Sequence, residues 1–287
     1  MTAAWEQAHD IVVGVDPVRD WHLAVAWAAD EAHRRRLPLR LVLAVPPQHD
    51  VQHIDDTPQQ AALRHGGADR LDQVASWVRD RHPEVTVGTD LLGGFPAHVL
   101  VAQARSARLV VLGSRHLGRA AEFFSAGSTV VPVAAQAACP VVAVGDAEHV
   151  TQRPAYLVVG VDGSAATTDA LTLAFDEADR RGAALRVICV WQPPLFLLND
   201  EEVALKAQRF LLSEATAGLA DKYPDVHVTH EVLTGHPVEE LARAAEHALA
   251  LVVGRRGRGG YTGMRLGSVA HGLLHRAHCP VVTVPTG

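Results

Sequence analysis

The chain has 287 residues, 48% of them hydrophobic, which is enough for one large domain or two ordinary ones with full cores. Its formal net charge of −6 argues against a general binder of nucleic acid or of membrane surfaces. Apolar runs have strand length and are broken by glycine, proline or charge, so we expect no membrane span. The first residues show no basic region followed by an apolar stretch, so we also expect no signal peptide.

The first predicted strand, residues 11–16, begins an internal repeat. Its sequence Ile-Val-Val-Gly-Val-Asp matches Leu-Val-Val-Gly-Val-Asp at residues 157–162, and each copy continues into a helical stretch that ends in Arg-Arg. Further matches are Leu-Gly-Gly-Phe-Pro with Leu-Thr-Gly-His-Pro (92–96 and 233–237) and Cys-Pro-Val-Val with itself (139–142 and 279–282). We expect Cys139 and Cys279 to be buried apolar residues of a reducing compartment, not a disulfide or a metal site.

Each copy alternates predicted strands and helices, beginning and ending with a strand. The predicted strands of the second copy lie near residues 156–162, 185–191, 226–233, 250–254 and 280–285. They are continuous apolar runs, as expected when both faces of a sheet are covered. The alternation implies an α/β fold with a doubly wound parallel sheet and right-handed crossovers. We predict two tandem domains, residues 1–148 and 154–287, and the short polar join favours packed domains.

A glycine-rich loop follows the fourth predicted strand of the second copy. Two residues separate Gly254 from Gly257, and nine more lead to Gly267 and Ser268 at the start of a predicted helix. Glycines let the backbone approach an anion, and a helix N-terminus offers free N–H groups and a positive dipole end. The loop therefore predicts a phosphate site. Asp162 ends the first strand of the same copy and is expected at the same edge of the sheet.

Together these motifs resemble the universal stress protein family in its tandem-domain, ATP-binding form. The resemblance covers essentially the whole chain and rests on Val-Gly-Val-Asp, on G-x2-G-x9-G-[ST], on Cys-Pro-Val-Val-x-Val and on the duplication. It implies a five-stranded parallel sheet per domain, similar to the adenine nucleotide alpha hydrolases, with the domains paired through their edge strands. It also implies a cytoplasmic stress-response regulator that binds adenine nucleotide, and leaves a homodimer open.

The resemblance assigns residues of the second copy to the nucleotide. They are Asp162, Gly163, Val190, Gly254, Gly257, Gly267 and Ser268. The residue types also allow other roles, because Asp162 can cap the following turn, Val190 can be plain core and Ser268 can be a helix N-cap. The arginines around the loop add positive potential, but none is assigned as a ligand. A bound ATP would carry Mg²⁺, which needs few protein ligands, and the sequence shows no carboxylate cluster for it.

The corresponding site of the first copy is altered. Its candidate nucleotide ligands are Asp16, Gly113, Gly127 and Ser128. However, Pro17 and Val18 replace a Gly-Ser pair, His116 replaces the second glycine of the loop, and ten residues follow it instead of nine, including Glu-Phe-Phe at 122–124. A Cβ at residue 116 would clash if that backbone adopted a positive φ. Either this site binds nucleotide with a rearranged loop, or it has become structural.

Three histidines follow the glycine loop of the second copy at helical spacing. His271, His275 and His278 fall on one face of the predicted helix, a spacing that could present imidazoles to Zn²⁺. Val269 and Leu273 mark the expected core face and leave the histidines outward. A solvent-exposed face or a protein interface is therefore the alternative to a metal site.

Three kinds of function compete: a nucleotide-binding regulator, an enzyme that slowly hydrolyses ATP or phosphorylates itself, and a scaffold with vestigial sites. Hydrolysis needs a residue that orients water and strong charge stabilisation at the γ-phosphate. The sequence has no Walker-type G-x4-G-K-[ST] motif and no obvious general base within residues 255–266. Binding is therefore favoured over turnover, and the intact second motif argues against a scaffold. The sequence names neither the regulated process nor a protein partner.

Overall fold

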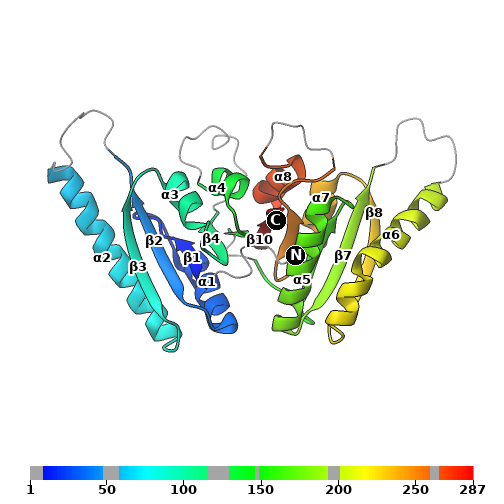
Figure 1. The fold of residues 1–287 in the computed structure, drawn as a ribbon, viewed down its shortest axis with the longest axis horizontal. Helices are drawn as coiled ribbons and strands as arrows, with labels where there is room; N and C mark the ends of the chain where they lie inside the picture. Colours follow the sequence, from blue (N-terminus) through cyan, green and yellow to red (C-terminus); the bar gives the residue numbers. More distant parts are fainter. Residues whose placement is uncertain are drawn as a thin grey trace. The chain divides into compact units, whose positions relative to one another are not determined.

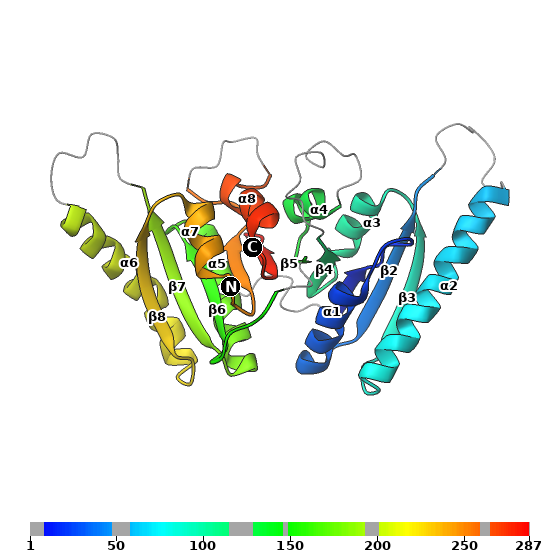
Figure 2. The same cartoon turned by 180° about the vertical axis from the view of Figure 1, so that it is seen from behind.

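The structure is a computed structural model, which describes residues 9–47, 58–114, 129–145, 149–192, 201–258 and 265–286. Leaving residues 114–126 aside, the chain divides into two compact units, of which the first ends at Val144 and the second starts at Gly145. Within its described residues each unit alternates five strands with four helices (Figure 1; seen from behind in Figure 2). The duplication in the sequence therefore corresponds to two copies of one fold.

The bounds of the elements repeat between the units. The strands of unit 1 are β1 (Ile11–Gly14), β2 (Leu39–Val45), β3 (Val87–Gly93), β4 (Leu109–Gly113) and β5 (Val141–Val144). Its helices are α1 (His22–Arg35), α2 (Pro58–Arg81), α3 (Pro96–Gln103) and α4 (Val130–Gln136). The strands of unit 2 are β6 (Tyr156–Val161), β7 (Ala184–Trp191), β8 (Val228–Thr234), β9 (Leu251–Gly254) and β10 (Val281–Val284). Its helices are α5 (Ala165–Arg181), α6 (Glu201–Lys222), α7 (Pro237–Ala244) and α8 (Ser268–Arg276).

Both sheets have the same strand order. Unit 1 runs β3-β2-β1-β4-β5 and unit 2 runs β8-β7-β6-β9-β10, and every described pair within a unit is parallel. This confirms the predicted doubly wound α/β fold. The winding direction reverses between β1 and β4 and between β6 and β9, which are the places where such sheets bind ligands.

The central strands are buried because helices pack on the sheet from either side. In unit 1, α1 packs with α2 and α3 with α4, and the same pairs recur in unit 2 as α5 with α6 and α7 with α8. Cys139 and Cys279 are buried and unpaired, as predicted, and burial raises the pKa of each thiol to about 12. Among the residues that the structure describes, no helix combines the length and the apolar character that crossing a membrane requires.

Candidate functional site

A cavity of about 210 Å³ lies at the carboxyl ends of β6 and β9, the switch point of the second sheet. Its lining comes from the ends of β6, β7 and β9, from the loop after β9, and from the starts of α5, α7 and α8. Six of the predicted site residues line it, namely Asp162, Val190, Gly254, Gly257, Gly267 and Ser268. The structure thus brings the strand-end aspartate and the glycine loop to one place, as the sequence predicted.

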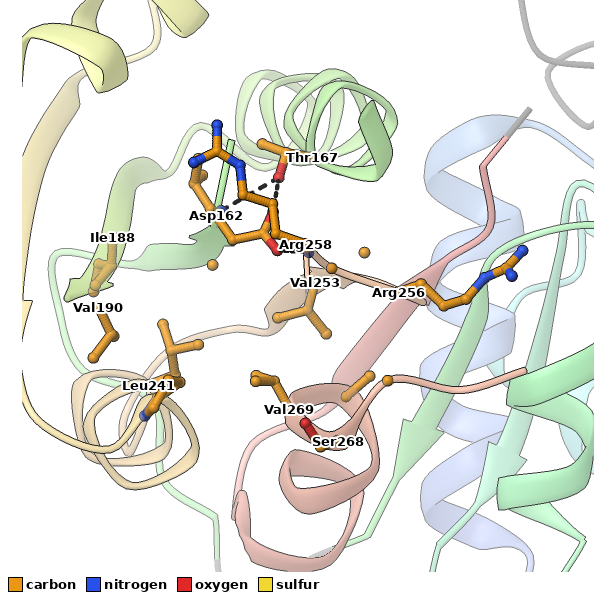
Figure 3. Close-up of a pocket in the computed structure, with 17 residues that line it drawn as sticks. Asp162, Thr167, Ile188, Val190, Leu241, Val253, Arg256, Arg258, Ser268 and Val269 are labelled. Atoms are coloured by element: carbon orange, nitrogen blue, oxygen red, sulfur yellow. Dashed lines mark hydrogen bonds between the residues drawn. The ribbon is translucent and has the colours of Figure 1, made fainter. Parts of the chain in front are cut away.

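One side of the cavity is apolar. Ile188 and Val190 from β7, Leu241 from α7 and Val253 from β9 surround it (Figure 3). Gly160 in β6 makes room for this side, because a Cβ there would lie 2.9 Å from Leu241 Cδ1 and 3.1 Å from Val253 Cγ1. Branched aliphatic side chains without polar atoms suit a flat apolar ring more than a hydrated ion.

The opposite side is organised by the carboxylate of Asp162. Its Oδ1 accepts hydrogen bonds from the Ser164 N–H and the Thr167 hydroxyl, both at 2.9 Å, and its Oδ2 accepts one from the Arg258 N–H at 2.8 Å (Figure 3). Partial burial disfavours the charged form, but these bonds outweigh it and hold the pKa of Asp162 below its ordinary value. Asp162 therefore caps its own turn, the alternative role considered from the sequence, and also fastens the glycine loop to the end of β6.

Gly257 owes its place to this contact. A Cβ on Gly257 would overlap Oδ2 of Asp162, so any other residue would displace the loop from the carboxylate. Glycine is also required at position 163, because its φ is +72°. The carbonyl of Gly163 accepts a hydrogen bond from Arg258 Nη2 at 3.1 Å. Gly163 itself does not line the cavity. The second glycine of the loop, Gly257, thus has a steric cause within the protein.

The glycine loop ends at the N-terminus of α8, which borders the cavity. Gly267, and not Ser268 as the sequence suggested, is the N-cap: its carbonyl accepts the first helical bond, from the His271 N–H at 2.9 Å. The Gly267 N–H donates to the Arg255 carbonyl at 2.8 Å, which closes the loop. Ser268 is then the first helical residue. The first N–H groups of a helix lack partners within it and favour an anion nearby.

Sequence reasoning missed several lining residues. The Thr167 hydroxyl is buried and bonds Asp162, yet a single threonine five positions after the aspartate has no recognisable pattern, and the first copy has Trp21 there. Arg256 and Arg258, left unassigned as surface charges, also line the cavity. The Arg256 side chain extends away from the other labelled residues (Figure 3). The clustering of arginines in the loop was the available signal.

The first unit differs at the corresponding aspartate. Oδ1 of Asp16 accepts from the N–H groups of Val18 and Arg19, at 2.9 and 2.8 Å, and Arg19 Nε lies 3.9 Å from Oδ2. Gly113 ends β4 and is exposed. Other residues named for this site lie outside the described residues: His116, Glu122, Phe123, Phe124, Gly127 and Ser128. The choice between a rearranged and a structural first site therefore stays open.

The sequence suggested that the histidine face of α8 points outward, and the structure differs. His271 and His275 are half-buried, with ring centroids 4.7 Å apart, and burial lowers the pKa of His271. Only His278 of the three is exposed, and Val269 lies at the cavity instead of in the core. The error arose because Ala270 occupies the buried position that the helical pattern gave to Val269. These three histidines do not come together as a set of metal donors.

Comparisons with known proteins agree with this architecture. The model of the universal stress protein family matches residues 8–145 and again 156–285. The chain is 35% identical over 292 residues to a universal stress protein of Mycolicibacterium smegmatis, covering 96% of this chain and 97% of the relative. It is 34% identical over 287 residues to universal stress protein Rv2623 of Mycobacterium tuberculosis, covering 95% of each.

A solved structure shows the same fold. A universal stress protein from Archaeoglobus fulgidus superposes with a TM-score of 0.74 at 16% identity, covering 98% of this chain and 97% of its own. Both copies of the repeat therefore match one family, in sequence and in architecture. The chain belongs to the universal stress protein family, in a tandem arrangement of two copies.

Proposed function

We propose that this protein is a regulator that binds adenine nucleotide, ATP in particular, in the second of two domains spanning residues 1–148 and 154–287. One observation carries the proposal. An apolar slot, a carboxylate fixed by the glycine loop and the N-terminus of α8 all border a single cavity at the switch point of the sheet. Membership of the universal stress protein family supports a role in a cytoplasmic stress response.

Each part of the cavity suits one part of the nucleotide. Ile188, Val190 and Leu241 offer the adenine ring apolar contact. Asp162 has three of its roughly four acceptor positions occupied, which leaves one on Oδ2 for a ribose hydroxyl. The backbone of the glycine loop and the N-terminus of α8 would hold the phosphates, with the Ser268 hydroxyl as a further donor. Mg²⁺ would be held mainly by phosphates and water.

Binding is better supported than hydrolysis. Among the described residues that line the cavity, Asp162 is the only carboxylate, and there is neither a histidine nor a lysine. Asp162 already accepts three hydrogen bonds, and its lowered pKa makes it a weak general base. ATP would therefore act as a bound signal rather than as a substrate that turns over quickly.

The first domain is proposed as the weaker of the two sites. Asp16 and Gly113 keep their places at the ends of β1 and β4, and Gly127 with Ser128 completes the candidate set in the sequence. Among the described residues, Asp16 accepts hydrogen bonds from the Val18 and Arg19 N–H groups of its own turn, and the loop of the first copy departs in sequence from that of the second.

The most direct test is to denature the purified protein and to separate the released small molecules by chromatography. We expect adenine nucleotide in the supernatant. If none is released, and if calorimetric titration with ATP and Mg²⁺ also gives no binding heat, the proposal is wrong.

A further inference from the structure

Two histidines and a glutamate converge in unit 1, at the amino ends of its strands. His33 lies in the last turn of α1, and His82 and Glu84 lie in the turn between α2 and β3; we call these three residues the His–Glu cluster. Figure 2 shows the C-terminal ends of α1 and α2 at the same edge of the unit. One donor atom of each residue lies within 4.8 Å of the others, and no other such group of three occurs among the described residues.

The spacing between the His82 and Glu84 donors suits a tetrahedral ion. His82 Nδ1 lies 3.4 Å from Glu84 Oε1, and His33 Nδ1 contacts the same oxygen. A tetrahedral Zn²⁺ with bonds of about 2.0–2.1 Å keeps its donors roughly 3.4 Å apart. The rings of His33 and His82 stack with centroids 4.6 Å apart, and the His33 side chain is 52% exposed, so its ring is able to turn toward a shared ion.

A hydrogen bond to Asp30 fixes the orientation of the His82 ring. Its Nε2 lies 2.7 Å from Asp30 Oδ1, and because a carboxylate only accepts, Nε2 carries the proton. Asp30 is held in turn by Arg81, whose Nε and Nη2 donate to its two oxygens at 2.7 and 2.9 Å. A carboxylate behind a histidine is the usual outer support of a metal-binding imidazole. When the His82 ring is neutral, its Nδ1 faces Glu84 Oε1 acceptor to acceptor, and a cation between them would satisfy both.

The second domain shows that the fold does not require these donors. Its matching turn reads Lys-Tyr-Pro-Asp-Val where the first reads Arg-His-Pro-Glu-Val, and it carries Asp179, Tyr223 and Asp225 in the places of the cluster. The supporting aspartate, however, is present in both domains, as Asp30 and Asp176. The imidazoles are therefore a property of the first domain alone and are not dictated by packing.

We propose that His33, His82 and Glu84 form a binding site for a divalent transition metal, Zn²⁺, with water completing its coordination. Asp30 and Arg81 position His82, and the exposure of Glu84, 54% of its side chain, gives the ion access. Binding displaces the proton from His33 Nδ1, since a metal-bound nitrogen must be deprotonated. The ion would tie the end of α1 to the turn before β3.

The test compares the protein with a variant that imports the residues of the second domain, His33→Asp with His82→Tyr and Glu84→Asp. Zinc binding is measured by calorimetry and by metal analysis after gel filtration. We expect the unmodified protein to bind one more Zn²⁺ per chain than the variant, and Zn²⁺ to raise the melting temperature of the unmodified protein only. His82→Tyr alone should lose the same ion if the triple variant folds poorly.

His65 provides the matched control for a histidine-rich chain. It lies on α2 outside the cluster, with 82% of its side chain exposed, and His65→Ala should leave zinc stoichiometry unchanged. Equal stoichiometry and equal affinity in the unmodified protein and in both cluster variants would overturn the proposal. The cluster would then be a group of protonated imidazoles paired with carboxylates.

Discussion

Asp16 and Asp162 follow the same strand in two copies of one fold, yet their hydrogen-bond donors among the described residues differ. Among the described residues, the hydrogen-bond donors to Asp16 are its near neighbours Val18 and Arg19. Asp162 instead accepts a bond from Arg258, 96 positions further along the chain. Both carboxylates thus cap their own turns, and Asp162 also anchors a remote loop.

The residues around each aspartate also differ between the two copies. Gly163 adopts a φ of +72°, which Pro17 cannot adopt at the same place in the first copy. Thr167 supplies a buried hydroxyl to Asp162, whereas the first copy has a buried Trp21 there. Both copies therefore keep the fold and the carboxylate, while the residues around the carboxylate differ.

The largest expected effect on ATP affinity comes from a side chain at Gly257, where the glycine loop contacts Asp162. Gly257→Asp places a side chain where even a Cβ overlaps Asp162, and adds a negative charge beside the phosphates. We expect ATP affinity to fall by about 100-fold or more, because bringing like charges together costs several kcal/mol. Gly66→Asp, at an exposed position of α2 with open space around it, is the control and should bind ATP normally. Unchanged affinity in Gly257→Asp would place the nucleotide elsewhere.

The two aspartates provide a paired test. Asp162→Ala removes three hydrogen bonds that fix the loop, and we expect ATP affinity to fall about tenfold, since a bond to a charged group contributes about 1.5–3 kcal/mol. Asp16→Ala removes the bonds from Val18 and Arg19 in the first domain and should leave the tighter site unchanged. Calorimetric titration measures both variants. Equal losses in the two would show that the domains are equivalent.

A smaller effect is expected where the two copies end their first helices. The C-cap of α5 is Gly182 with φ +57°, and the C-cap of α1 is Arg36 with φ +55°, a left-handed conformation that favours glycine. Arg36→Gly should stabilise the protein by up to about 1 kcal/mol, and Gly182→Arg should destabilise it by a similar amount. Urea unfolding measures both changes. If both substitutions shift stability in the same direction, backbone conformation does not control these ends.

The smallest effect concerns pH. Because the pKa of Asp162 in the folded protein lies below its unfolded value near 3.8, its hydrogen bonds stabilise the fold above that value. The stabilisation is lost as the pH falls through the folded pKa. Asp162→Asn should therefore be less stable than the unmodified protein at pH 6, and the difference should shrink toward pH 2.5. A difference that stayed constant over this range would mean that the charge of Asp162 contributes nothing.

Much of this architecture could be predicted from the sequence because its motifs occur in both copies of the repeat. The strands of the second copy lie within two residues of their predicted places, and the spacing from Gly254 to Gly267 led to the cavity. Thr167 was missed because its role depends on a turn that only three-dimensional structure reveals. The N-cap was placed one residue late because Gly and Ser are both acceptable caps. The His–Glu cluster was missed because His33 lies in α1, whereas His82 and Glu84 lie in the turn after α2.

The central claim is that one site, in the second domain, binds ATP more tightly than the other. Calorimetric titration of the nucleotide-free protein with ATP and Mg²⁺ tests it most directly, because it reports the number of sites together with their affinities. We expect one tight site per chain, with any second site clearly weaker. Two sites of equal affinity, or no binding at all, would contradict the claim.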